Sequence, residues 1–259
     1  MLFTVYTLAS SSKGNSIYVR LGDDEILIDA GISCKRLCDS LKAIGTDITR
    51  IKAIFVTHEH SDHVSGLETV AKKYRIPIHI TEPSARAYLC SSKAEYAAQT
   101  AIIHPPIFSE TVGALTVRSF ATPHDSHASV GYVVSDGTNE HTLAIATDIG
   151  MITDEVSDAL VGCENVILES NHDENMLLCG AYPYELKRRI LSSRGHLSNE
   201  AAAAFAAHLA ASGTKRILLA HLSQDNNLPE LAYHSSLAAI DGRDVYLDVA
   251  APNTPTKLV

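Results

Sequence analysis

The segment THEHSDH, residues 57–63, places three imidazoles and the carboxylate of Asp62 within six positions, immediately after a short apolar run. Side chains alternate in an extended segment, so His58, His60 and Asp62 are expected on one side, and a turn into a following helix would swing His63 towards them. A solvated polar loop gives no reason to crowd four such groups along one edge, whereas a metal ion does. The sequence therefore predicts a strand that ends in a metal site and leads into a helix.

The rest of the chain alternates between strand patterns and helix patterns in both halves. Short β-prone stretches separated by Ser, Gly and Asp turns open the chain, and a helical spacing of apolar residues follows the histidine segment. This alternation predicts an α/β fold with two sheets packed face to face and helices outside, a four-layer αββα sandwich, with residues 1–259 forming one domain. The predicted strands are residues 2–9, 16–21, 25–29, 53–56, 77–80, 166–169 and 216–220, with a further series between 114 and 147, and the predicted helices include 33–44, 184–192 and 198–212.

Composition narrows the class of protein. The chain has 259 residues, of which 46% are hydrophobic and 20% charged, so it can bury a large core. No stretch approaches the ~20 apolar residues of a membrane helix, and the N-terminus lacks a leader pattern, so we expect a soluble cytoplasmic protein. The cysteines are odd in number and form no CxxC pair, so we expect reduced, mostly buried thiols at Cys34, Cys38, Cys90, Cys163 and Cys179.

The formal net charge of -9 argues against a surface-wide basic footprint for nucleic acid. Whole-chain charge says little about the field inside a cleft, where a cationic metal centre could still attract an anion. Local basic residues occur at Lys187, Arg188, Arg189 and Arg194. A binding patch and a solvated helix face are both open as interpretations of that cluster.

The HxHxDH pattern resembles the signature of the metallo-β-lactamase superfamily, and the likeness extends beyond it. Asp148 in ATDIG is similar to the aspartate that bridges both metal ions, and His221 after ILLA is similar to the last histidine ligand. Asp29 in LIDAG looks like the acidic residue that holds a histidine ligand or the loop by hydrogen bonding. In the segment PHDSH, His124 follows the strand end as the third motif of the superfamily does and is our predicted ligand, with His127 as the alternative.

The resemblance implies a two-metal site with nitrogen and oxygen ligands. Imidazole and carboxylate suit Zn²⁺, Mn²⁺ or Fe, so the donor type leaves the metal open. Two divalent ions outweigh the ligating carboxylates and one bridging hydroxide, so the centre should favour an anionic substrate. Asp62 and Asp148 would also hold the attacking hydroxide. One ion is assigned to His58, His60 and His124, the other to Asp62, His63 and His221, and Asp148 joins the two.

The motifs ESNHDEN and GHLSN are similar to those of phosphodiesterase branches of the superfamily, including the tRNA 3′-processing ribonuclease Z type. Those branches pair an acidic residue with a histidine that protonates the leaving oxygen. By this likeness His196 is the general acid and Glu169 its orienting partner. The alternative is that Ser198 caps a helix and His196 merely lies near the cap. His172 either lines the same cleft or has no role in it.

Almost end to end, the chain resembles the YycJ (WalJ) family, through SSSKGNS at residues 10–16 and the motifs named above. Members are regarded as metal-dependent nucleases with a proposed 5′ to 3′ DNA exonuclease role in mismatch repair. The resemblance implies a phosphodiesterase that acts on nucleic acid, expected at DNA 5′ ends, with no membrane partner. The alternative is a small-molecule hydrolase acting on a thioester, lactone or lactam, whose third motif is usually Gly-His-Thr rather than Pro-His-Asp-Ser. The 10–16 loop either presents backbone N–H groups and Lys13 to a phosphate or is an ordinary hairpin connection.

Overall fold

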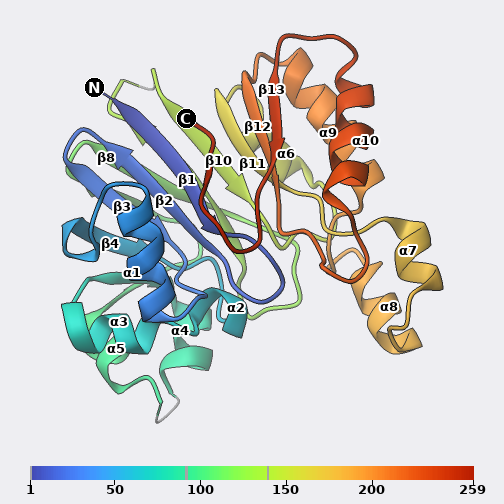
Figure 1. The fold of residues 1–259 in the computed structure, drawn as a ribbon. Helices are drawn as coiled ribbons and strands as arrows, with labels where there is room; N and C mark the ends of the chain where they lie inside the picture. Colours follow the sequence, from blue (N-terminus) through green and yellow to red (C-terminus); the bar gives the residue numbers. More distant parts are fainter. Residues whose placement is uncertain (1, 91–92, 139) are drawn as a thin grey trace.

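The computed structural model describes residues 2–90, 93–138 and 140–259, and its backbone is organised around two seven-stranded sheets (Figure 1). The first sheet has the order β14-β1-β2-β3-β4-β5-β6, and the second has the order β13-β12-β11-β10-β9-β8-β7. The strands of the first sheet are β1 (Phe3–Ala9), β2 (Ser16–Leu21), β3 (Asp24–Ile28), β4 (Ile51–Phe55), β5 (Ile78–Thr81), β6 (Ala101–His104) and β14 (Thr256–Lys257). Those of the second are β7 (Ser109–Val112), β8 (Leu115–Ala121), β9 (Val130–Asp136), β10 (Thr142–Ala146), β11 (Asn165–Glu169), β12 (Arg216–Ala220) and β13 (Tyr246–Val249).

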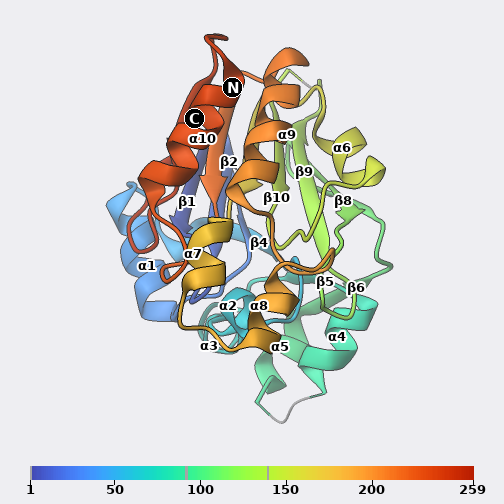
Figure 2. The ribbon, with the colours of Figure 1, turned by 90° about the vertical axis from the view of Figure 1, so that its right-hand side faces the viewer.

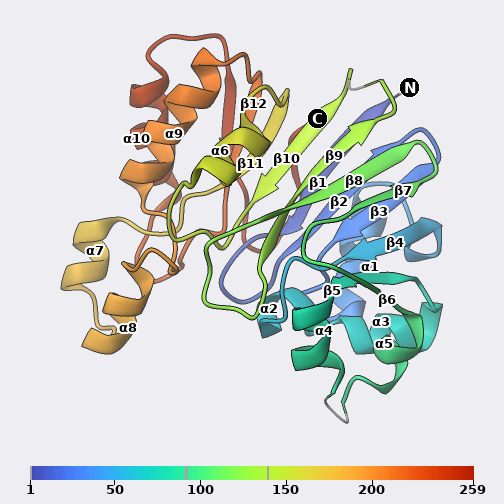
Figure 3. The same cartoon turned by 180° about the vertical axis from the view of Figure 1, so that it is seen from behind.

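Helices cover the outer faces of both sheets, as three views of the ribbon show (Figures 1, 2 and 3). One apolar cluster lies between the sheets and one lies under the helices on each side, so four layers enclose three cores. This arrangement confirms the predicted αββα sandwich. The helices over the first sheet are α1 (Cys34–Ala43), α3 (Leu67–Tyr74), α4 (Glu82–Leu89) and α5 (Glu95–Thr100), and those over the second are α6 (Asp154–Leu160), α9 (Asn199–Ala211) and α10 (Pro229–Ile240). The remaining helical segments are α2 (Ser61–Val64), α7 (Glu174–Cys179), α8 (Tyr184–Ile190) and the 3₁₀ turn η1 (Ile48–Arg50).

The apolar residues of the central strands alternate between two cores. In β3, Ile26 and Ile28 pack between the sheets, whereas Leu27 packs beneath the helices of the first sheet. In β12, Leu218 packs between the sheets and Ile217 beneath the helices of the second. Both faces of these strands are buried, so they are almost continuously apolar in sequence.

Parallel pairing brings several strand ends to one edge of the sandwich. Strands β3 and β4 are parallel in the first sheet, and β10, β11 and β12 are parallel in the second. The carboxyl ends of parallel strands lie at the same edge of a sheet, which is where ligands bind in open α/β sheets. Asp29, the THEHSDH segment, Asp148, the ESNHDEN motif and His221 follow these strand ends, whereas His124 follows β8 and His196 follows α8.

Two expectations need correction. The thiols are free, as expected, but Cys90 and Cys179 are exposed and only Cys34 and Cys163 are buried, so "mostly buried" is wrong. The two exposed thiols lie at the C-terminal ends of α4 and α7, where the chain turns towards solvent. The short edge strands β6 and β7 were not predicted; each has only four residues, and none of those residues is buried. Among the described residues, no helix combines the length and apolar character that crossing a membrane requires.

Candidate metal centre

The histidine segment follows β4, and its second half is already helical. His60 is the N-cap of α2 with an extended backbone, and Asp62 and His63 lie in the helix itself. The expectation that Asp62 continues the alternation of an extended strand is therefore wrong. The turn begins two residues earlier than expected, so His58 and His60 point from the loop while Asp62 and His63 point from the helix.

The structure brings the other six predicted ligands together around Asp148. Oδ2 of Asp148 is 3.2 Å from Nε2 of His63, and Oδ1 is 3.5 Å from Nε2 of His221 and 3.7 Å from Nε2 of His124. Asp148 thus lies between two groups of side chains. The first group is His58, His60 and His124, the second is Asp62, His63 and His221, and in each group the ligand atoms all lie within 4.8 Å of one another.

Three residues at the site share an unusual backbone conformation. Asp29, Asp148 and His221 have φ angles of 61°, 57° and 58°, in the left-handed region that non-glycine residues rarely adopt. Each follows the end of a strand that points towards the site: β3, β10 or β12. Such strain persists where the surroundings hold it in place and is concentrated at functional sites. Here it turns a side chain inward at the strand end, instead of letting the strand continue.

Asp29 holds the first-sheet half of the site in place. Its Oδ2 lies 2.7 Å from Nδ1 of His63, whose N–H donates to it, and it also accepts the hydroxyl of Thr57 at 2.8 Å. Oδ1 accepts the backbone N–H of Thr57 at 2.8 Å. These bonds fix the ring so that Nε2 of His63 faces Asp148. This is the anchoring geometry that the resemblance implied for Asp29.

Glu169 likewise orients histidine rings in the second sheet, and it contacts two of them. Its Oε1 lies 2.8 Å from Nδ1 of His196 and 2.9 Å from Nδ1 of His221. The backbone N–H groups of Ile149 and Leu197 donate to Oε2 at 2.8 and 3.2 Å. Burial opposes ionisation of Glu169, but the charges and hydrogen bonds of His196 and His221 outweigh it and lower its pKa to about 2. The sequence predicted the pair of Glu169 with His196 but not the pair of Glu169 with His221.

The structure separates the two candidates for the third motif. His124 is 3% exposed, and its Nδ1–H donates to the carbonyl of Gly195 at 3.1 Å, which leaves Nε2 facing the other ligands. The side chain of His127 is 67% exposed and bonds to Glu59 at 2.7 Å, away from the group. Arg194 donates to the carbonyl of His124 at 2.9 Å and so braces this loop.

The 10–16 loop contacts the site through residues that sequence reasoning did not single out. Nδ2 of Asn15 donates to Oδ2 of Asp62 at 3.1 Å, and its backbone N–H donates to the carbonyl of Asp62 at 2.8 Å. Ser10 accepts the backbone N–H of His221 at 2.7 Å. The loop therefore joins the ligands of both sheets, while Lys13 at its tip is exposed. A polar loop without a periodic pattern gave no sign of these contacts.

The donor set fits divalent cations. Nε2 of His58 is buried without a hydrogen-bond partner among the described residues, and it faces the group of ligands. Burial, followed by the charge of His63, holds the pKa of His58 well below its usual value, so its imidazole is neutral and can bind a metal. Burial opposes ionisation of Asp62, but hydrogen bonds from His221 and His63 keep its pKa below the ordinary value. Imidazole nitrogen and carboxylate oxygen are the ligands that Zn²⁺ and similar ions prefer.

Comparison with known proteins agrees with this geometry. The family described as Beta-lactamase superfamily domain matches residues 24–222. Exodeoxyribonuclease YycJ from Bacillus anthracis is 37% identical over 266 aligned residues, which cover 97% of this chain and 96% of that protein. The chain belongs to the YycJ/WalJ family. Exodeoxyribonuclease WalJ from Streptococcus pneumoniae is 32% identical, with 99% of this chain and 97% of that protein covered.

Solved structures support the fold of the family. The metallo-beta-lactamase fold protein YhfI from Bacillus subtilis superposes with a TM-score of 0.72, covering 98% of this chain and 99% of that one at 15% identity. A likeness at that identity concerns the fold alone. Together with the family match and the group of His and Asp side chains, it identifies this YycJ/WalJ family member as a metal-dependent hydrolase.

Proposed function

We propose that this protein is a DNA exonuclease that works from the 5′ end with two divalent ions, Zn²⁺ or Mn²⁺, with Fe as a further option. The main observation behind this proposal is that His196 lies beside Asp148. Nδ1 of His196 is 3.8 Å from Oδ1 of Asp148 and is hydrogen-bonded to Glu169. That arrangement adds a positioned proton donor to a metal site. The printed names of the YycJ and WalJ relatives as exodeoxyribonucleases favour DNA over a thioester or lactone.

The ligand assignments follow the two groups around Asp148. We assign His58, His60 and His124 to one ion, assign Asp62, His63 and His221 to the other, and assign Asp148 to both. Ligands come from both sheets, so we also infer that residues 1–259 act as one metallo-β-lactamase-like domain.

The chemistry divides between the ions and the chain. When bound, the ions supply Lewis acidity that polarises the scissile phosphate and promotes deprotonation of the attacking water. Glu169 holds Nδ1 of His196, so Nε2 is the nitrogen that can deliver a proton to the leaving oxygen. Asp29 and Glu169 keep the ligand rings of His63 and His221 in fixed orientations.

Two basic residues near the site, Arg189 and Lys187, already have partners within the protein. Arg189 forms an ion pair with Asp125, and Lys187 donates to the carbonyls of Leu178 and Gly180 at 2.7 Å each. These bonds brace α8 and the loop of His124 rather than leaving free cations for a long duplex. We infer that DNA is held mainly at the metal centre, near one strand end.

The deciding experiment uses metal-reconstituted protein with duplex DNA, single-stranded DNA, RNA and a simple phosphodiester. A strand labelled at its 5′ end should release labelled mononucleotides or short oligonucleotides before internal fragments form. Asp148→Asn serves as the inactive control. Release only from 3′ ends would overturn the polarity, and hydrolysis of thioesters or lactones without action on any nucleic acid would overturn the nuclease assignment.

A further inference from the structure

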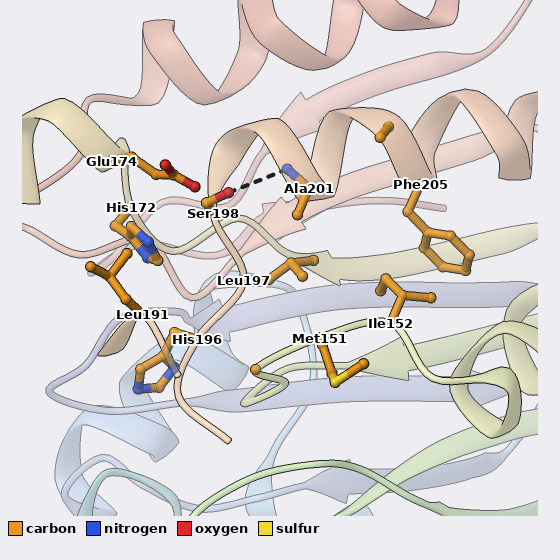
Figure 4. Close-up of a pocket in the computed structure, with 12 residues that line it drawn as sticks. Met151, Ile152, His172, Glu174, Leu191, His196, Leu197, Ser198, Ala201 and Phe205 are labelled. Carbon is orange, nitrogen blue, oxygen red and sulfur yellow. Dashed lines mark hydrogen bonds between the residues drawn. The ribbon is translucent and has the colours of Figure 1, made fainter. Parts of the chain in front are cut away.

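A pocket with a volume of about 510 Å³ opens beside His196 (Figure 4). His196 belongs both to this pocket and to the group around Asp148. The pocket and the metal centre are therefore neighbours that share one wall. Most of the remaining lining is apolar and comes from three separate segments, with Met151 and Ile152 after β10, Leu191 after α8, and Leu197, Ala204 and Phe205 at or in α9.

The polar side of the pocket contains an unpartnered buried histidine. His172 is 1% exposed, and neither ring nitrogen has a hydrogen-bond partner among the described residues. Its backbone is fixed, because its carbonyl accepts the N–H of Asn199 at 2.9 Å and the residue forms a β-bridge with Ser198. Figure 4 shows the ring between Glu174 and Leu191 at the pocket wall. Buried polar groups normally have partners, so a ligand in the pocket would supply the missing one.

We propose that this pocket holds the unpaired nucleoside at the 5′ end of the DNA strand, the one whose 3′ oxygen leaves. The inference rests on the nuclease function proposed above. In that reaction water adds to the phosphorus, the bond from phosphorus to the 3′ oxygen breaks, and the proton of His196 goes to that oxygen. The products are the terminal nucleotide with a 3′ hydroxyl and a strand with a new 5′ phosphate. The nucleoside attached to the leaving oxygen must then lie on the His196 side of the phosphate.

The pocket chemistry suits one base and not a base pair. Apolar walls match the faces of any base, which accounts for recognition without a strong sequence preference. Phe205 adds an aromatic ring to these walls. Burial lowers the pKa of His172, so its ring is neutral and offers one donor and one acceptor to a base edge. A base enters such a pocket only when it is unpaired, so a frayed or single-stranded end should be preferred.

The test compares cleavage of the first linkage in two single strands that differ only in their 5′-terminal nucleotide, which is normal or abasic. The wild-type protein should prefer the normal end by roughly tenfold in kcat/KM, the usual scale of a base contact. Ala204→Phe fills the pocket from an exposed position of α9 and should abolish that preference. Ala207→Phe, on the same helix outside the pocket lining, is the matched control and should retain it. His172→Phe keeps the ring but removes both nitrogens, so the preference should fall roughly 2- to 10-fold.

The outcomes separate the two proposals. A wild-type protein that cleaves neither strand would overturn the nuclease function and this inference with it. A wild-type protein that cleaves both strands equally well would leave the nuclease function standing and overturn the pocket assignment. Retention of the preference in Ala204→Phe would overturn it too. A 2-aminopurine at the 5′ end gives an independent readout, because its fluorescence should change on binding to the wild type and Ala207→Phe but not to Ala204→Phe.

Discussion

Oε1 of Glu169 lies 2.8 Å from Nδ1 of His196, and the same oxygen lies 2.9 Å from Nδ1 of His221. One carboxylate therefore orients both a proposed metal ligand and the proposed proton donor. A single buried side chain therefore sets the distance between these two functions.

His196→Ala should keep the metal content of the wild type and lose roughly 10²- to 10⁴-fold in rate, the usual contribution of a positioned general acid. The loss should shrink for a substrate whose leaving group needs no protonation. Steady-state rates on DNA and on an activated phosphodiester measure the two losses. Equal losses on both substrates would show that His196 has another role.

The purified protein should hold about two divalent ions per chain, because two groups of ligands flank Asp148. Elemental analysis after reconstitution measures the count. His221→Ala should remove the ion of the second group first, since the first group of His58, His60 and His124 is unchanged. Saturation at one ion, with the second group empty in a structure of the loaded protein, would contradict the two-metal site.

Asp62→Asn should abolish turnover and leave the fold intact. The carboxylate lies 3.4 Å from Nε2 of His221, and its side chain is mostly buried in the site rather than in an apolar core, so the substitution removes charge from the site without opening a core. Circular dichroism and the midpoint of urea unfolding provide the control for folding. Near-normal activity of Asp62→Asn with full metal content would refute the assignment.

Affinity for DNA should depend weakly on salt. In the described part of the chain, Lys187 and Arg189 beside the site are already paired, so the loss between 50 and 200 mM salt should be smaller than the roughly 10³- to 10⁵-fold expected for six to ten phosphate contacts. Binding isotherms of a catalytically inactive variant over that range test this. A steep dependence of affinity on salt concentration, typical of many phosphate contacts, would show that DNA binds a basic surface of the protein such as that of α8.

Glu25 should make stability depend on pH at a distance from the metal ligands. Burial disfavours its charge, but hydrogen bonds from Thr46 and Arg50 outweigh burial and hold the pKa of Glu25 below its usual value. A lowered folded pKa adds stability above the unfolded value of about 4.3, and this stability is lost as pH falls through the folded pKa. Glu25→Gln should lower the free energy of unfolding at neutral pH by about 1 to 3 kcal/mol.

Urea unfolding at several pH values follows this effect. The difference between Glu25→Gln and the wild type should shrink as the pH falls from the unfolded value of about 4.3 through the lowered pKa of the folded carboxylate. A difference that stays constant across that range would mean that packing, and not charge, gives Glu25 its contribution.

Much of the fold could be predicted, and so could the clustering of the candidate ligands, because both leave local signatures. The segment THEHSDH after a buried strand predicted a metal site, and the alternation of strands and helices predicted the four layers. The contact of Glu169 with His221 could not be predicted, since it joins residues 52 positions apart through the register of β11 and β12. The left-handed backbone of Asp148 and His221 was also hidden, because aspartate and histidine adopt it only when the surroundings impose it.

The histidine pair of the third motif shows the same limit. His124 and His127 are indistinguishable by residue type and lie in one short loop. The choice depends on Gly195 and Glu59, which come from distant segments and offer one ring a buried carbonyl and the other an exposed carboxylate. Local sequence carries no information about such partners.

The division of the ligands between two sheets also sets an order of events during protein synthesis. A growing chain acquires His58 to His63 early but gains His221 only after β12 has been made. Until the second sheet docks on the first, the early histidines lack Asp148 and His221 and cannot form the full site. The proposed capacity to cut DNA would therefore arise only late in folding, and a chain that stops before β12 would lack His221 and could not damage the nucleic acid around it.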